Sequence, residues 1–243
     1  MTNARQVVLL RVGIDTSSSS GGILGPIFDD RTFEFIPIKS ERDCLGRTYG
    51  NTLGRYGLKL IDYFPDGSKQ KMQGAFVHFD PEFETFTYGD PTTLKQGLRN
   101  LKLGDLLVFY AGLRGWGNCR TDAGLYIIGY FVVELAGKYN DLKRSDMLKP
   151  FEKNWHTLNE REKDRFDRLV LINGGTGSRL LEKAVKIGAN EKDRGGHQVF
   201  VLDPKLQKDF GKFTELNAIQ RSAPRWVKGE FCDKAAAFVT GLK

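Results

Sequence analysis

The sequence predicts an α+β fold, because several apolar runs typical of buried β-strands stand beside a few short helical patterns. The runs at residues 106–110 and 125–133 are the clearest. They are rich in β-branched and aromatic side chains, which is typical of strands covered on both faces. A third observation is the spread of 28 glycines along the chain. Because the glycine-rich loops are dispersed among the strands, we expect one domain over residues 1–243.

Composition describes an ordinary globular protein of 243 residues, with 40% hydrophobic and 28% charged side chains. No segment has the length and apolarity of a transmembrane helix, and the first ten residues lack the apolar region of a signal peptide. We therefore expect a cytoplasmic protein without a membrane partner. Three dispersed cysteines form no CxxC pair and only three histidines are present, so neither a metal centre nor a cofactor is expected.

The net charge of +7 is distributed unevenly along the chain. Residues 1–136 contain 15 basic and 15 acidic side chains, whereas residues 137–243 contain 22 basic and 15 acidic ones. A basic half is typical of a protein with a polyanionic partner such as nucleic acid. A solvated surface of mixed charge is the alternative interpretation.

Residues 7–14 are predicted to form the first strand, which is followed by the segment DTSSSSGG at residues 15–22. Serine hydroxyls and glycine amides of this kind can cradle a phosphate. No Gly-Lys-Ser/Thr follows, so the segment is not a P-loop. An ordinary surface loop is the alternative. The candidate ligand-binding residues here are Arg11, Asp15, Ser17, Ser18, Ser19, Gly21 and Gly22.

Within the loop-like residues 40–75, Arg47, Tyr49, Arg55 and Tyr56 interleave cations with aromatic rings. Such mixtures suit stacked bases and phosphates, and they also occur in ordinary surface loops. Further strands are predicted at residues 32–38, 75–79, 169–172 and 198–202, and helices at 92–101, 157–168, 179–187, 204–210 and 235–242. Residues 138–155 are expected to be irregular.

A glycine-rich turn at residues 173–178 precedes the predicted helix at 179–187. A turn of this kind presents free amides and the positive end of the helix dipole to an anion. The alternative is a simple helix start with Ser178 as its cap. Ser178, Arg179 and His197, which precedes the strand at 198–202, are therefore candidate ligand-binding residues.

A pair of motifs in the centre of the chain carries a family resemblance. Gly104-Asp105 opens an apolar run that ends in Phe109-Tyr110, and a polar loop separates it from IIGYFVV at residues 127–133. This ordered pair resembles the PUA-like superfamily, particularly its EVE, ASCH and YTH branches. The resemblance implies a curved mixed β-sheet or barrel with flanking helices, a barrel core at about residues 90–210 and an enlarged N-terminal region.

The segment RVGIDTSSSSGGILGPIFDDRTFEFIPI at residues 11–38 carries a narrower likeness. It resembles the start of the nucleotide-modification-associated domain of the third type, a family found near DNA-base modification systems. The resemblance implies a role with nucleic acid or a modified nucleotide, and by itself it does not imply catalysis.

The sequence favours binding over catalysis. It contains no GxSxG elbow, no Pro-Cys-x-x-Cys deaminase signature and no GxGxxG fingerprint between a strand and a helix. PUA-like domains that read bases use an aromatic-lined pocket with a basic rim. Tyr110 and Trp116 lie at and just beyond the end of the central strand, and Arg114 and Arg120 flank Trp116.

The sequence thus predicts a protein that binds DNA or RNA, with recognition of a modified base or nucleotide as its specific role. Tyr110, Arg114 and Trp116 are the central candidates for ligand binding. An enzyme that modifies nucleotides or bases is one alternative, and it would use the 15–22 loop together with an acidic residue. A structural RNA-binding protein is the other. The oligomeric state is not indicated.

Overall fold

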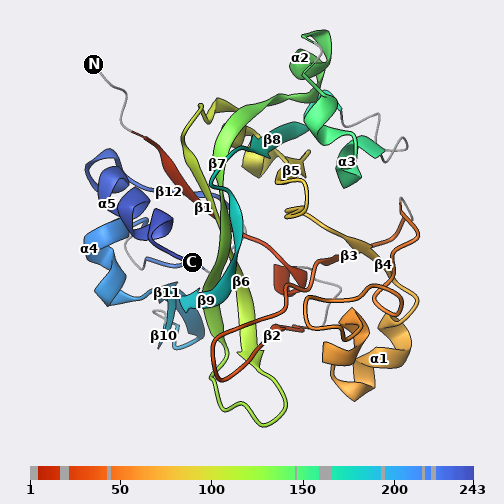
Figure 1. Cartoon of the computed structure of the whole chain (residues 1–243). Coiled ribbons are helices and arrows are strands. Elements are labelled where there is room, and N and C mark those ends of the chain that lie inside the picture. Colours follow the sequence, from red (N-terminus) through yellow and green to blue (C-terminus); the bar gives the residue numbers. More distant parts are fainter. Residues whose placement is uncertain are drawn as a thin grey trace.

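The computed structural model describes residues 5–16, 22–42, 45–145, 147–158, 166–192, 195–214, 217–219 and 223–243. It confirms the α+β class, since a large mixed sheet is accompanied by a few short helices (Figure 1). In the described part of the chain, eight strands form this sheet in the order β12-β1-β6-β7-β8-β5, with β2 added to β6 and β9 added to β7. No helix in these ranges is long and apolar enough to cross a membrane.

The centre of the sheet is the antiparallel pair β6 (Leu106–Gly115) and β7 (Gly124–Lys138), as predicted. Leu106 lies opposite Val132 and Leu113 lies opposite Gly124. The two strands are longer than predicted, so the connecting loop is limited to residues 116–123. The other strands of the sheet are β1 (Val7–Arg11), β2 (Gly25–Ile27), β5 (Thr87–Asp90), β8 (Val170–Gly174), β9 (Arg179–Lys186) and β12 (Arg225–Trp226).

The sheet is mixed in direction and open. β1 and β2 both pair with β6 in parallel, whereas β7, β8 and β9 pair with their neighbours antiparallel. Its strand order runs from an edge at β12 to an edge at β5, so the described residues form no closed barrel. The mixed sheet that was predicted is therefore present, and its barrel form is not.

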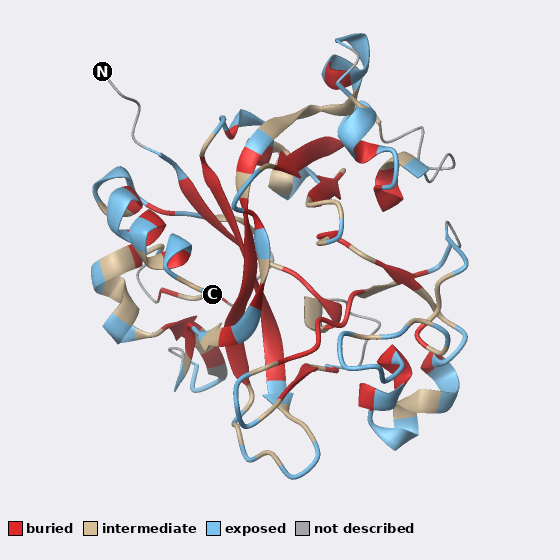
Figure 2. Ribbon diagram, in the orientation of Figure 1, coloured by how far each residue is buried: buried red, intermediate tan, exposed pale blue. Residues whose placement is uncertain are grey.

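Burial of β6 and β7 explains why their sequences are almost entirely apolar. Residues 106–113 and 124–131 are all buried (Figure 2). Phe109 and Phe131 meet at the centre of the core, with ring centroids 4.6 Å apart. One side of the sheet is covered by α4 (Gln207–Phe210) and α5 (Gly229–Thr240), which contribute buried side chains to the same core (Figure 1).

The N-terminal region lies on the other side of the sheet (Figure 1). It contains α1 (Asp66–Met72) and the small antiparallel sheet of β3 (Ile38–Ser40) and β4 (Phe76–His78). Its side chains form a second hydrophobic cluster that includes Ile14, Tyr49, Tyr63 and Met72. This region therefore has a small core of its own beside the main sheet.

Two predicted elements are wrong. Residues 179–186 of the helix predicted at 179–187 form the strand β9 instead, because residues Tyr126 to Tyr130 of β7 provide backbone hydrogen bonds to it. The turn before it leads from β8 to β9, which pair with successive stretches of β7, and Gly177 adopts a φ of 94° there. Residues 32–38 are not a continuous strand. They form only isolated bridges at Thr32 and Phe33 before β3 begins.

The remaining predictions hold with shifted boundaries. The strands expected at 75–79, 169–172 and 198–202 are β4, β8 and β11 (Gln198–Leu202), and the first strand ends at Arg11. The helix expected at 92–101 is a 3₁₀ helix, and the terminal helix begins earlier than predicted, at Gly229. Most of the helix expected at 157–168 lies outside the described residues.

The smaller elements connect these parts. They are the strand β10 (Gly188–Lys192), the helices α2 (Tyr139–Arg144) and α3 (Trp155–Leu158), and the 3₁₀ helices at Ile14–Thr16, Leu60–Tyr63, Thr93–Asn100, Lys149–Phe151 and Pro204–Leu206. Residues 138–155, expected to be irregular, thus contain two short helical elements, and the helix expected at 204–210 is present as a 3₁₀ turn followed by α4.

Candidate functional site

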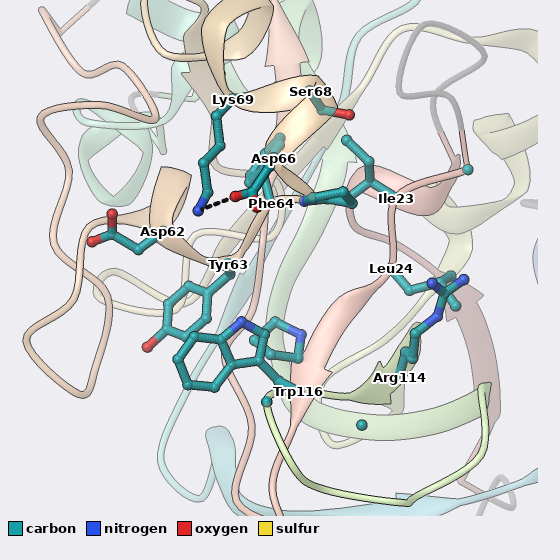
Figure 3. A pocket seen from close by; sticks show the side chains of 15 residues that line it. Ile23, Leu24, Asp62, Tyr63, Phe64, Asp66, Ser68, Lys69, Arg114 and Trp116 are labelled. Carbon is teal, nitrogen blue, oxygen red and sulfur yellow. Dashed lines mark ion pairs between the residues drawn. The ribbon is translucent and has the colours of Figure 1, made fainter.

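The structure brings three of the predicted ligand-binding residues together around one cavity. Gly22, Arg114 and Trp116 line a space of about 530 Å³, which we call the Trp116 cavity. It lies between the end of β6 and two segments of the N-terminal region, residues 22–26 and 62–69 (Figure 3). Its other lining residues are Ile23, Leu24, Pro26, Asp62, Tyr63, Phe64, Pro65, Asp66, Ser68, Lys69, Gly115 and Gly117.

Aromatic packing fixes the indole ring of Trp116 at the wall of this cavity. The ring makes edge contacts with Tyr63 at a centroid distance of 5.3 Å and with Phe28 at 5.8 Å. Its backbone N–H donates to the Ile27 carbonyl at 3.1 Å. Trp116 is only half-buried by these contacts, so part of its surface is available to a ligand. Figure 3 shows Trp116 and Tyr63 side by side at this wall.

The charges around the Trp116 cavity are balanced. Lys69 forms an ion pair with Asp66 at 2.9 Å, and the exposed Arg114 and Asp62 complete the set. Two cations therefore face two carboxylates. Binding in this cavity must come mainly from aromatic and apolar contact, and attraction for a polyanion must come from other parts of the surface.

A second cavity, the Glu34 cavity, has a volume of about 700 Å³. Its lining includes Arg47 and Arg55, the two arginines of the interleaved string in the sequence. The two tyrosines of that string do not line it. Tyr49 is fully buried and donates its hydroxyl to the Pro37 carbonyl at 2.8 Å, and Tyr56 packs against Phe28.

Glu34 is the unusual group in this second cavity. Its side chain is buried, with 3% of the residue exposed, and its Oε2 accepts a hydrogen bond from the Arg55 backbone N–H at 2.6 Å. Gly54 packs so closely against the carboxylate that a Cβ would not fit between them. Burial raises the pKa of Glu34 to about 7, although the Arg55 backbone and charge act to lower it. The group can therefore hold or release a proton near neutral pH.

The Glu34→Gln variant is expected to flatten the pH dependence of stability. Because the folded-state pKa of about 7 lies above the ordinary value of 4.5, folding favours the protonated form. This contribution is fully present below about pH 4.5 and is lost as the pH rises through about 7. Glutamine resembles the protonated form, so the variant should gain stability on the order of a few kcal/mol over the wild type at pH 8.

Chemical denaturation at pH 4.5, 6 and 8 would measure this difference. Glu84→Gln is the matched control, since Glu84 lines the same cavity with a side chain that is 77% exposed. The control should follow the wild type at every pH. Equal stability of wild type and Glu34→Gln at pH 8 would contradict the assignment of a proton-holding Glu34.

A third cavity, which we call the polar cavity, has a volume of about 250 Å³, and more than half of its lining residues are charged or polar. Arg11 lies on its wall and pairs with Asp15 through Nη2–Oδ2 and Nε–Oδ2 distances of 2.5 and 3.0 Å. The Gly112 N–H also donates to the same carboxylate oxygen at 3.2 Å. Burial raises the pKa of Asp15, and the Arg11 guanidinium opposes this shift. Two of the predicted ligand-binding residues thus bind each other.

A second ion pair lines the polar cavity. Lys95 Nζ lies 2.7 Å from Asp90 Oδ2, and Thr92 N–H and the Tyr88 hydroxyl donate to the same carboxylate at 2.7 and 3.1 Å. Burial alone would raise the pKa of Asp90, but Lys95 and Thr92 hold it below its ordinary value. Both cations of this cavity are therefore paired.

Three further side chains on this wall were not singled out by the sequence. His78, Asp80 and His156 place one nitrogen or oxygen each within 4.8 Å of one another, an arrangement that can hold a metal ion. The sequence predicts no metal centre, because its three dispersed histidines show no ligand spacing. Only the fold, which packs α3 against β5, brings His156 to the other two.

The other predicted site residues lie elsewhere. Tyr110 is fully buried in the main core, where its hydroxyl donates to the Ile219 carbonyl at 2.6 Å. Ser178 accepts a hydrogen bond from the Val132 N–H at 2.9 Å, and the guanidinium of Arg179 lies 5.9 Å from the Tyr130 ring. His197 is exposed next to β11. Ser17, Ser18, Ser19 and Gly21 lie outside the described residues.

These features define an α+β protein with a large open mixed sheet and several cavities between the sheet and its N-terminal region. The sequence model of the family described as nucleotide modification associated domain 3 matches residues 6–239. The chain therefore belongs to this family, and the family description associates it with nucleotide modification. No curated protein and no solved structure matches the chain.

Proposed function

We propose that the protein binds nucleic acid and recognises a single base, with a modified base as the specific ligand, in the Trp116 cavity. The observation that carries this proposal is the wall formed by Tyr63 and the half-buried Trp116 in a space of about 530 Å³. A cavity of this size accepts a nucleotide, and the exposed part of the half-buried indole offers a surface on which a base can stack. The family description supports the same class of ligand.

The energetics agree with a base bound outside the helical stack. Extruding a base costs a few kcal/mol, and stacking on an aromatic ring returns about 1–3 kcal/mol per base. The remaining free energy must come from phosphate contacts. Because the charges at the Trp116 cavity are balanced, the basic excess of residues 137–243 is the source that we propose for those contacts.

An enzyme acting on nucleotides or bases is the second candidate. It is favoured by Glu34, a buried carboxyl whose pKa of about 7 suits proton transfer near neutral pH. In this alternative the base would lie in the Glu34 cavity, and Arg47 would contact its phosphate. Incubation with nucleotides and oligonucleotides, followed by mass spectrometry of the products, separates the two candidates.

We also propose that the fold is a divergent form of the PUA-like architecture. Gly104-Asp105 forms the turn that opens β6, with Gly104 at a φ of 86°. The Asp105 carboxylate accepts hydrogen bonds from the N–H groups of Gln6 and Lys102 at 2.8 and 2.7 Å, so it joins β1 to β6. This role for the Gly-Asp turn supports the relationship, and an experimental structure compared with PUA-like domains would test it.

Binding of oligonucleotides is expected to weaken steeply as the salt concentration rises. Each phosphate contact releases condensed counterions, so log K should fall linearly with log salt, by about 0.9 per phosphate for duplex DNA and about 0.7 for single strands. Fluorescence anisotropy with duplex DNA, single-stranded DNA and RNA would measure the slopes and identify the preferred nucleic acid. The absence of binding to all three at low salt would rule out the proposed function.

A further inference from the structure

We propose that His78, Asp80 and His156 bind a divalent first-row transition-metal ion at the wall of the polar cavity. The site is independent of the proposed base recognition, because it shares no residue with the Trp116 cavity.

The three ligand atoms are spaced for a common centre. His156 Nε2 lies 3.6 Å from Asp80 Oδ2, and the ring centroids of His78 and His156 are 4.7 Å apart. All three ligand atoms lie within 4.8 Å of one another. Two bonds of the usual 2.0–2.1 Å span at most about 4.2 Å. At the tetrahedral angle the same bonds place two ligand atoms about 3.3–3.4 Å apart, so an ion can bridge the group once the wider separations close by up to about 1.4 Å.

A buried nitrogen points to a missing partner. His78 is 7% exposed, and its Nε2 has no hydrogen-bond partner within the ranges that the structure describes. The great majority of buried polar atoms in proteins have a hydrogen-bond partner, so an imidazole nitrogen without one needs an explanation. The His78 ring stacks on Trp155 at 3.9 Å with an interplanar angle of 28°, which fixes its orientation. A metal ion is a partner that an imidazole nitrogen accepts readily.

Surrounding contacts hold the other two side chains in position. The Gly89 N–H donates to Asp80 Oδ1 at 3.0 Å, which leaves Oδ2 directed to His156. Asn154 accepts from the His156 N–H at 3.1 Å and donates to Thr87 on β5. A Cβ on Gly89 would lie 2.8 Å from the His156 ring, so glycine is required for this close packing. Such supporting contacts orient ligands before the metal binds.

The donor set indicates the class of ion. Two imidazoles and one carboxylate suit Zn²⁺, Fe²⁺ and Co²⁺, whereas Mg²⁺ and Ca²⁺ prefer oxygen ligands. Three protein ligands leave coordination positions open, and these face a cavity of about 250 Å³. Arg11 and Lys95 on the same wall are neutralised by Asp15 and Asp90, so the Asp80 carboxylate remains to offset the charge of the ion.

Titration of chelator-treated, full-length protein with Co²⁺ and Zn²⁺ tests the proposal. The wild type should bind one equivalent of Co²⁺, visible as d–d absorption bands that Zn²⁺ displaces. The Asp80→Asn and His156→Ala variants should bind at least about 10–100-fold more weakly, which is the loss seen when even a supporting residue is removed. His197→Ala is the matched control, since His197 is exposed and lies outside the group, and it should bind as the wild type does.

A second measurement keeps the test decisive if a variant fails to fold. X-ray absorption of the wild-type cobalt complex should show two imidazole ligands. The proposal would be overturned by a cobalt complex that contains no imidazole ligand. It would also be overturned if a folded Asp80→Asn variant bound Co²⁺ as tightly as the wild type, or if the protein responded to Mg²⁺ alone. Since no nucleic acid is present in these experiments, their outcome is separate from that of the base-recognition proposal.

Discussion

Replacing Arg11 with methionine is expected to lower the free energy of unfolding by about 3–5 kcal/mol at neutral pH. The Asp15 side chain is 3% exposed and the Arg11 side chain 13%. Removing the guanidinium therefore leaves a buried carboxylate whose hydrogen bond from the Gly112 N–H is long at 3.2 Å. Methionine keeps much of the arginine stem, so the loss reports the charge rather than packing. Urea denaturation followed by circular dichroism measures the effect.

The pH dependence of this loss follows from the sign of the pKa shift. Burial already raises the pKa of Asp15, and removing Arg11 takes away the charge that opposes the shift. The folded state of Arg11→Met thus favours the protonated carboxyl, and the destabilisation should appear as the pH rises above the ordinary value of 3.8. The Arg11→Met/Asp15→Asn double variant removes the charge and should recover much of the stability. A single variant as stable as the double variant at pH 7 would contradict a buried ion pair.

The Trp116→Ala variant is expected to weaken oligonucleotide binding by about 1–3 kcal/mol, the free energy of one stacked base. This loss corresponds to a roughly five- to 150-fold higher Kd. Because Trp116 also packs against Phe28 and Tyr63, some loss of stability should accompany the loss of affinity. Anisotropy titration and thermal melting of the same preparation separate the two effects.

Trp226→Ala provides the matched control, because Trp226 is 37% exposed and lies on β12 at the edge of the sheet. It should bind oligonucleotides as the wild type does. Arg114→Ala should lose less affinity than Trp116→Ala if it contacts only a phosphate, and its loss should shrink at high salt. An unchanged affinity of Trp116→Ala together with a sharply lowered melting temperature would assign Trp116 a purely structural role.

The sequence predicted the centre of the fold well because burial on both faces leaves a clear signal. Residues 106–110 and 125–133 are apolar and rich in β-branched side chains because both faces of these two strands are buried. Residues 179–187 were mispredicted because RLLEKAVK has favourable helix propensities. The edge of β7 overrides that local preference, and no local sequence pattern reports the existence of such an edge.

The cavities, too, contain some residues that the sequence predicted and others that only the tertiary fold brings together. Trp116 and Arg114 were predicted because their loop is too polar and glycine-rich to be core. Their neighbour Tyr63 was not, since only the tertiary fold brings it to Trp116. His78 and His156 are separated by 78 positions, so no ligand spacing can reveal them. Glu34 lies in a segment with an ordinary alternating pattern, and its unusual pKa arises from burial beneath Gly54 and Arg55.

The pairing of β1 has a consequence for synthesis of the chain. Val7 lies opposite Leu106 on one side, and Val8 lies opposite Trp226 on the other. At a translation rate of about 5–20 residues per second, the second partner follows β1 by roughly ten to forty seconds. The first partner follows β1 by roughly five to twenty seconds at the same rate. Until then the apolar segment VVLLR of the nascent chain has neither neighbour. This segment of the nascent chain is therefore where we expect a chaperone to bind.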